Sequence, residues 1–220
     1  MEACRPPAGR RGRGGGGLCL EGLDGVKIAQ ISDVHSADLE GPLRAALEEA
    51  APDLIVMTGD LVNREDRDLS RALSLARMAA ETAPAFFAPG NHEVDSPCWP
   101  ELRDGLEAAG VQVLEDRAVL RNFRGEAVNL EGLWDLNHDP LGQAHARETL
   151  PERIRVLCRE GALNVLLSHR PGLLEEYGAG GADVVFCGHA HGGQVRLPLV
   201  GPVFAPDEGL FPKHTAGVYR

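Results

Sequence analysis

Histidine, carboxylate and carboxamide side chains recur in this sequence directly after short apolar segments. His189 and His191 lie one residue apart in "CGHAHGG", which follows "DVVF". The same kinds of group follow four earlier apolar segments, and these residues are Asp33, His35, Asp60, Asn91, His92 and His169. An ordinary polar turn explains any one of them taken alone. Their repetition after five segments predicts instead one site with nitrogen and oxygen ligands, a mixture that suits Mn, Fe or Zn.

The apolar segments are predicted to be strands that alternate with helices. The strand candidates are "VKIAQIS", "DLIVMT", "AFFA", "VQVL", "AVNLEGLW", "LNVLLS" and "DVVF". Helices are predicted at "GPLRAALEEA", over about 66–82, over about 100–109 with an end at Gly110, from Pro151 onward, and near 172–177. This alternation predicts an α/β domain with a largely buried sheet, in which ligands collect where the strands end.

Composition limits the possible partners. Lys and Arg total 22 against 33 Asp and Glu, which gives a formal net charge of -11. Such a chain is not expected to bind nucleic acid through general charge attraction. An anionic substrate would need local positive charge, which bound divalent cations could supply. The five cysteines include no C-x-x-C pair, which argues against a zinc ribbon and a disulfide framework.

The N-terminal residues differ in composition from the rest of the chain. Residues 1–24 are rich in Gly, Arg and Pro and are predicted to be a flexible leader, whereas 25–220 form the domain. Arg10 and Arg11 lack the apolar stretch of an export signal behind them. No apolar run approaches the roughly 18 residues of a membrane span, so we expect no transmembrane segment and a cytoplasmic location.

Five motifs in a fixed order resemble one known family. The segments "ISDVHSAD", "PDLIVMTGDLVN", "FAPGNHE", "LLSHRPGLL" and "GHAHGGQVRLPLVG" are similar to those of the calcineurin-like metallophosphoesterase superfamily, and more narrowly of its YkuE/YaeI-like bacterial phosphodiesterase branch. The resemblance runs from about Val26 to the end of the chain. It implies a four-layer fold of two mixed sheets packed face to face between helices, with a dinuclear metal centre.

The resemblance also implies a role for each candidate residue. One of two divalent ions would be held by Asp33, His35 and His191. The second ion would be held by Asn91, His169 and His189. Asp60 would bridge the two ions, and His92 would act on the substrate. Gly188, Gly192 and Gly193 would let the backbone turn beside the metals, where a side chain would crowd the site.

The expected activity is hydrolysis of a phosphodiester or pyrophosphate by metal-activated water. The expected substrate is a phosphorylated small molecule or a lipid-linked pyrophosphate. Two alternatives stay open, namely a binuclear hydrolase of another substrate and a metal-binding interaction protein without catalysis. Arg170 is a candidate phosphate contact or a structural ion pair, and Glu93 either orients a site residue or caps a helix. His138 and Asp139 are assigned to a solvated turn.

Two departures from the branch bear on these expectations. Its members usually begin with a membrane anchor or export signal, so a peripheral or exported location is the alternative to a cytoplasmic one. They also continue past the segment matched by "FPKHTAGVYR" into further strands of the second sheet. We therefore expect that sheet to lack its last strands; the oligomeric state is left open.

Overall fold

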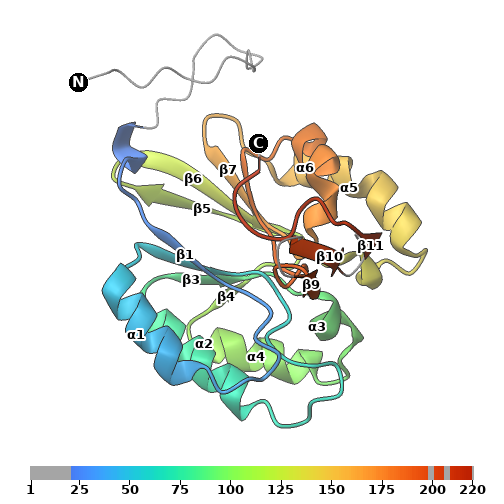
Figure 1. The fold of residues 1–220 in the computed structure, drawn as a ribbon. Coiled ribbons are helices and arrows are strands. Elements are labelled where there is room, and N and C mark those ends of the chain that lie inside the picture. Colours follow the sequence, from blue (N-terminus) through green and yellow to red (C-terminus); the bar gives the residue numbers. More distant parts are fainter. Residues whose placement is uncertain (1–20, 198–200, 206–208, 220) are drawn as a thin grey trace.

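Two four-stranded sheets pack against each other and are flanked by helices on their outer faces (Figure 1). The structure, a computed structural model, describes residues 21–197, 201–205 and 209–219. The expected four-layer α/β architecture is confirmed. Residues 1–20 of the predicted leader lie outside the described residues, while Glu21–Leu23 form a 3-10 turn whose Leu23 packs between the sheets.

The first sheet is parallel throughout, where a mixed sheet was expected. Its order is β1-β2-β3-β4, formed by β1 (Ile28–Ile31), β2 (Leu54–Met57), β3 (Ala85–Phe87) and β4 (Gln112–Val113). All four residues of β2 are buried, as its continuous apolar letters predict. The outer face is covered by α1 (Glu40–Ala50), α2 (Ser70–Thr82) and α4 (Trp99–Ala108).

The second sheet is mixed. Its order is β5-β6-β7-β8, formed by β5 (Arg117–Phe123), β6 (Glu126–Gly132), β7 (Leu163–Leu167) and β8 (Val184–Phe186). The β5–β6 pair is antiparallel, whereas β6, β7 and β8 are mutually parallel. Its outer face is covered by α5 (Gln143–Leu157) and α6 (Leu174–Gly180). A small antiparallel sheet, β11-β10-β9, follows, with β9 (Val195–Leu197), β10 (Gly201–Ala205) and β11 (Gly209–Leu210).

The space between the sheets is filled from both sides. Val56 and Phe86 of the first sheet belong to the same buried cluster as Leu130 and Val165 of the second. Burying one such side chain contributes roughly 1.5–3 kcal/mol, so this layer fixes the two sheets relative to each other. At one edge Gln30 Nε2 donates to Thr58 Oγ1 at 2.8 Å and across the gap to the Cys187 carbonyl at 2.7 Å.

Besides the small sheet β9–β11, which was not predicted, three longer elements differ from the sequence prediction. Strand β5 was not predicted, because charged and polar residues interrupt its apolar letters and most of its side chains are exposed; a tight turn at Arg124 and Gly125, both with positive φ, joins it to β6. Helix α2 starts at Ser70 rather than near 66, since the Asp66 side chain accepts the Asn63 N–H and holds a loop there. Helix α5 starts at Gln143 and continues through Pro151.

The remaining helical segments are short. They are α3 (Asn91–Asp95), which directly follows the loop after β3, and the 3-10 turns η2 (Leu136–His138) and η3 (Pro171–Leu173). Within the described part of the chain, no helix has both the length and the apolar character that crossing a membrane requires.

Candidate metal centre

The predicted ligands meet at one end of the two sheets. Asp33 and His35 follow β1, Asp60 follows β2, Asn91 follows β3, His169 follows β7, and His189 and His191 follow β8. Most of these side chains line one polar pocket of about 590 Å³. Another hollow, of about 700 Å³, runs beside β8 and contains none of the predicted ligands in its lining. The predicted metal ligands therefore belong to the smaller pocket.

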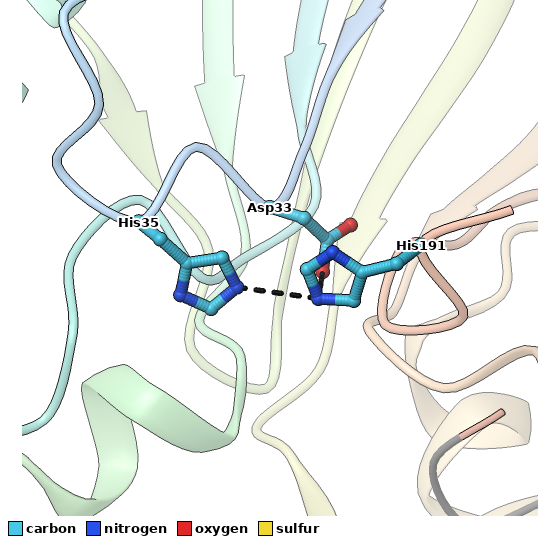
Figure 2. Close-up of side chains that lie close together, drawn as sticks. All are labelled: Asp33, His35 and His191. Carbon is cyan, nitrogen blue, oxygen red and sulfur yellow. Dashed lines mark hydrogen bonds and ion pairs between the residues drawn. The ribbon is translucent and has the colours of Figure 1, made fainter. Parts of the chain in front are cut away.

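One donor group, which we call the outer group, consists of Asp33, His35 and His191 (Figure 2). The Nε2 atoms of the two imidazoles lie 3.3 Å apart, and His191 Nε2 lies 3.5 Å from Asp33 Oδ1. Ligand atoms about 2.1 Å from one ion are separated by about 3 Å, so these spacings fit a shared cation. The side chains are 12%, 22% and 33% exposed for Asp33, His35 and His191 respectively.

The second donor group, called the inner group, consists of Asp60, His169 and His189, all of them buried. His169 Nε2 lies 3.1 Å from Asp60 Oδ2 and 3.1 Å from His189 Nδ1. The neighbouring Asn91 Oδ1 is buried and accepts no hydrogen bond from any part of the chain that the structure describes. A buried carbonyl without a partner is costly, and a cation at this position would satisfy it.

Asp60 is the member of the inner group that lies toward the outer group. Its Oδ1 accepts the His92 backbone N–H at 3.0 Å, which fixes the carboxylate. Its Oδ2 faces His169 of the inner group and lies 3.8 Å from His35 Nε2 of the outer group. This placement suits the bridging role that the family resemblance implies.

Hydrogen bonds behind the imidazoles determine which ring nitrogen can act as a ligand. His169 Nδ1 donates to the Thr58 carbonyl at 2.7 Å, so its Nε2 is left to bind an ion. His35 Nδ1 lies 3.1 Å from Asn63 Oδ1, and the Asn63 amide nitrogen donates to the His35 carbonyl, which turns the amide oxygen toward the ring. Asn63 was not among the predicted site residues, although it belongs to the quoted motif "GDLVN".

The inner group attracts positive charge even without an ion. Burial alone lowers the pKa of His169, but the adjoining Asp60 carboxylate more than offsets this and raises that pKa to about 9. Burial alone would raise the pKa of Asp60, but the hydrogen bond and the charge of His169 more than offset this effect. The pKa of Asp60 is therefore lowered to about 2. A carboxylate paired with an imidazolium in the interior is an environment that a bound cation would also satisfy.

The backbone at the site is held in an uncommon conformation. Five predicted ligands have left-handed φ angles, namely Asp33 at 56°, His35 at 50°, Asp60 at 53°, His189 at 67° and His191 at 49°. Non-glycine residues in this region cost roughly 1 kcal/mol or more each and concentrate at functional sites. The surrounding fold must therefore stabilise these loops.

Glycines make the close approaches around the ligands possible. A Cβ on Gly59 would come within 2.4 Å of the Gly90 nitrogen, and one on Gly90 within 2.4 Å of Asp60 Oδ1. A Cβ on Gly188 would meet Ser32 Oγ at 2.0 Å, as the crowding argument expects. At Gly192 that argument is wrong, because no atom of the described residues lies within 4 Å of the added Cβ; its φ of 68° is the reason for glycine there.

His92 faces the pocket beside Asp60. The Arg64 backbone N–H donates to His92 Nδ1 at 3.2 Å, so the neutral ring carries its proton on Nε2. This Nε2 lies 3.9 Å from Asp60 Oδ2. Burial lowers the pKa of His92, which favours the neutral ring. His92 is thus arranged as a hydrogen-bond donor to a group in the pocket.

Glu93 organises the backbone and does not face the pocket. Its two carboxylate oxygens accept the N–H groups of Gly90, Asp60 and Leu61 at 2.7–2.8 Å. Burial, with a contribution from the Asp60 charge, raises the pKa of Glu93 to about 7. The bond from Gly90 caps the turn that begins α3, and the bonds from Asp60 and Leu61 hold the loop of a predicted ligand, so the contacts fit both roles considered from the sequence.

Arg170 lines the pocket, but its guanidinium is buried in a bidentate pair with Asp135. The Nε–Oδ2 and Nη2–Oδ1 distances are 2.7 and 2.8 Å. This is the structural alternative weighed from the sequence, and direct phosphate contact stays a prediction. Asp135 could not be paired with Arg170 from the sequence, because 35 residues separate them.

The residues assigned to a solvated turn, His138 and Asp139, are not among the residues that line the polar pocket. His138 stacks on Trp134 with ring centroids 4.1 Å apart. Asp139 accepts from His145 Nδ1 at 2.8 Å, and this bond lowers the pKa of Asp139. Neither histidine is among the clustered donors found in the described residues.

Comparisons of the sequence and the fold with known proteins identify the family of this chain. Residues 26–193 match the family model for calcineurin-like phosphoesterases. Phosphodiesterase YaeI of Escherichia coli K12 is 33% identical over 195 residues, covering 83% of this chain and 66% of that protein. The uncharacterized metallophosphoesterase YkuE of Bacillus subtilis 168 is 28% identical over 211 residues, covering 92% and 70% of the two chains. The fold resembles that of the Thermus thermophilus protein TT1561, with a TM-score of 0.52 at 13% identity over 74% of this chain and 81% of that one. This chain therefore belongs to the calcineurin-like phosphoesterase family.

Proposed function

We propose that this protein hydrolyses phosphodiester bonds with the help of two divalent cations. The observation that carries the proposal is the convergence of two donor groups on Asp60, which faces both. Family membership implies a metal-dependent hydrolase of phosphoesters. The choice of a diester over a monoester is supported by the likeness to a protein named as a phosphodiesterase.

The residues present fit such ions. The outer group would hold one cation, and His169, His189 and Asn91 would hold the other, with Asp60 contributing to both. Imidazole, carboxylate and carboxamide donors suit Mn, Fe or Zn. When bound, two such ions clamp a phosphate and lower the pKa of a water molecule between them.

The protein's own side chains supply orientation and a hydrogen-bond donor. His92 presents Nε2–H to the pocket, because the Arg64 N–H occupies the other ring nitrogen. This N–H can stabilise negative charge on a phosphate oxygen or on the departing oxygen by donating a hydrogen bond to it. Glu93 keeps the Asp60 and Gly90 loops together by accepting N–H groups from both.

The test combines metal analysis with a substrate screen on one preparation of the full chain. Protein loaded with manganese, iron or zinc should contain about two ions per chain. The same samples are then assayed on bis(p-nitrophenyl) phosphate, p-nitrophenyl phosphate and a pyrophosphate diester. We expect the diester to be turned over with the highest kcat/KM. Two bound ions without turnover of any substrate would favour a non-catalytic metal-binding protein.

A further inference from the structure

The pocket wall beyond the two donor groups is made of amide and guanidinium side chains. These residues are Asn63, Arg64, Asn137, Gln143, Arg170 and Gln194. Among the described residues that line the pocket, none has an aliphatic side chain, and the histidines of the site are its only rings. Acyl chains and nucleobases usually bind against apolar or aromatic side chains. The wall therefore favours a hydrophilic group beside the phosphate.

Two of these side chains, Asn137 and Gln143, form a hydrogen-bonded strip with the neighbouring carboxylate of Asp95, and we call these three residues the amide strip. Asn137 Nδ2 donates to Asp95 Oδ2 at 3.3 Å, and Gln143 Nε2 donates to Asn137 Oδ1 at 2.6 Å. Two arginines hold the strip. Arg64 Nη1 lies 3.3 Å from Asp95 Oδ2, and Arg170 Nη2 donates to Asn137 Oδ1 at 3.1 Å.

The arginine behind the strip determines which way its amides point. A guanidinium only donates hydrogen bonds, so Asn137 must turn its oxygen toward Arg170. That oxygen then receives the amide nitrogen of Gln143, and the Gln143 oxygen is left as an acceptor. Gln143 is exposed at the first residue of α5, and within the described residues no donor bonds to its Oε1. The strip ends in an oriented acceptor at the pocket.

We propose that the amide strip binds hydroxyl groups of the alcohol that is esterified to the phosphate. A hydroxyl can donate to Gln143 Oε1 and accept from the Arg64 guanidinium, which also lines the pocket. The substrate class is then a phosphodiester of a polyhydroxylated alcohol, either glycerol or a sugar. Arg170 is a positioning residue that acts through Asn137. This inference rests on the proposed function, since it concerns the same pocket.

The test is calorimetric titration of the manganese-loaded full chain with two matched pairs of phosphate monoesters. Glycerol 1-phosphate is compared with propyl phosphate, and glucose 1-phosphate with cyclohexyl phosphate. Within each pair the phosphate and the carbon skeleton correspond, and mainly the hydroxyl groups differ. We expect at least one hydroxylated ligand to bind about tenfold tighter than its partner. The pair that shows the difference distinguishes glycerol from a sugar.

Variants connect that preference to the strip. Gln143→Ala should reduce the ratio of dissociation constants to within about twofold of unity, without weakening binding of the unhydroxylated partner. Glu148→Ala, an exposed change on the same helix, should keep the full ratio. Arg170→Gln should also lower the ratio of the two dissociation constants, whereas loss of fold or of a phosphate contact would weaken both ligands of a pair alike and leave their ratio unchanged.

The outcomes separate this inference from the proposed function, because diester turnover is measured in the same samples. Selective binding that depends on Gln143, without turnover, supports the strip and contradicts the proposed function. Turnover with equal binding within both pairs overturns the strip alone. Failure of all four ligands to bind, or tighter binding of the unhydroxylated partners, also overturns it.

Discussion

The inner and outer donor groups differ chiefly in burial. Asp60 and His169 of the inner group have side chains 2% and 0% exposed, whereas His35 and His191 of the outer group are 22% and 33% exposed. Asp60 and the inner imidazoles are paired with one another in the interior, where an unbalanced charge is costly. The outer group adjoins solvent and the "GHAHGG" loop. From this contrast we expect an ion held by the inner group to bind more tightly and to exchange more slowly than one held by the outer group.

The largest effect is expected from Asp60→Ala, which removes the carboxylate that faces both groups. We expect loss of both ions and a fall in diester turnover of at least about 10³-fold, since several kcal/mol of charge stabilisation is lost. Metal analysis and kcat/KM measure the two effects. Asp38→Ala, which removes an exposed carboxylate, serves as control. Retention of two ions in the Asp60 variant would contradict the shared role.

His92→Ala should separate chemistry from metal binding. We expect about 10²–10³-fold lower kcat with both ions retained, because a hydrogen-bond donor to the reacting phosphate is removed while all metal-binding atoms stay in place. The measurement is kcat alongside ions per chain. His145→Ala removes an imidazole from outside both donor groups and should retain activity. Full activity of the His92 variant would exclude the assigned role.

The difference in burial predicts two phases of metal loss. On addition of a chelator, about one ion per chain should leave at least roughly tenfold faster than the other, because the outer ligands adjoin solvent. His191→Ala should abolish the fast phase and retain one ion, and His189→Ala should impair the inner site instead. Stopped-flow detection of released metal follows both phases. A single phase in the parent protein would show that the groups do not differ as proposed.

The smallest effect concerns stability away from the site. Glu131 is fully buried under α5, and burial raises its pKa to about 7. The pKa of Glu131 in the unfolded chain is near 4.5. The protonated side chain therefore contributes its full stabilisation below pH 4.5, and this stabilisation is lost as the pH rises through 7. Glu131→Gln does not titrate, so it should be more stable than the parent by up to about 3 kcal/mol at pH 8 and nearly equal to it at pH 4.5.

Urea unfolding at the two pH values measures this difference. In the Glu131→Gln variant, metal addition can change how the free energy of unfolding depends on pH only through the donor groups, because residue 131 no longer titrates. The variant therefore sharpens the comparison between the two groups. A stability difference that is independent of pH would mean that Glu131 does not titrate in the folded protein as described.

Much of the site could be predicted from the sequence because each ligand is close in sequence to its strand. Asp33, Asp60, His169 and His189 lie two or three residues beyond a strand end. Parallel strands bring such residues to one edge whatever the loops do. The type of most elements in the two main sheets followed from apolar runs, apart from β5, whose apolar letters are interrupted by charged and polar ones.

What could not be predicted depends on contacts between distant parts of the chain. Arg170 pairs with Asp135 because β7 lies beside β6, and no local pattern connects the two residues. The hydrogen bonds of Glu93 depend on how the loops after β2 and β3 approach one another. The amide strip likewise joins residues from α3, η2 and α5.

The left-handed backbone at five ligands bears on how such a protein could change over evolutionary time. Glycine adopts these φ angles without strain, so a change from aspartate or histidine to glycine would relax the loop while erasing a ligand. Descendants released from selection for catalysis should therefore keep the architecture and lose metal capacity by single steps, first at the partly exposed His35 and His191, where relief of strain is not offset by loss of a buried ion pair. Recovering the centre would require reintroducing strained residues one at a time, each unfavourable until the set is complete.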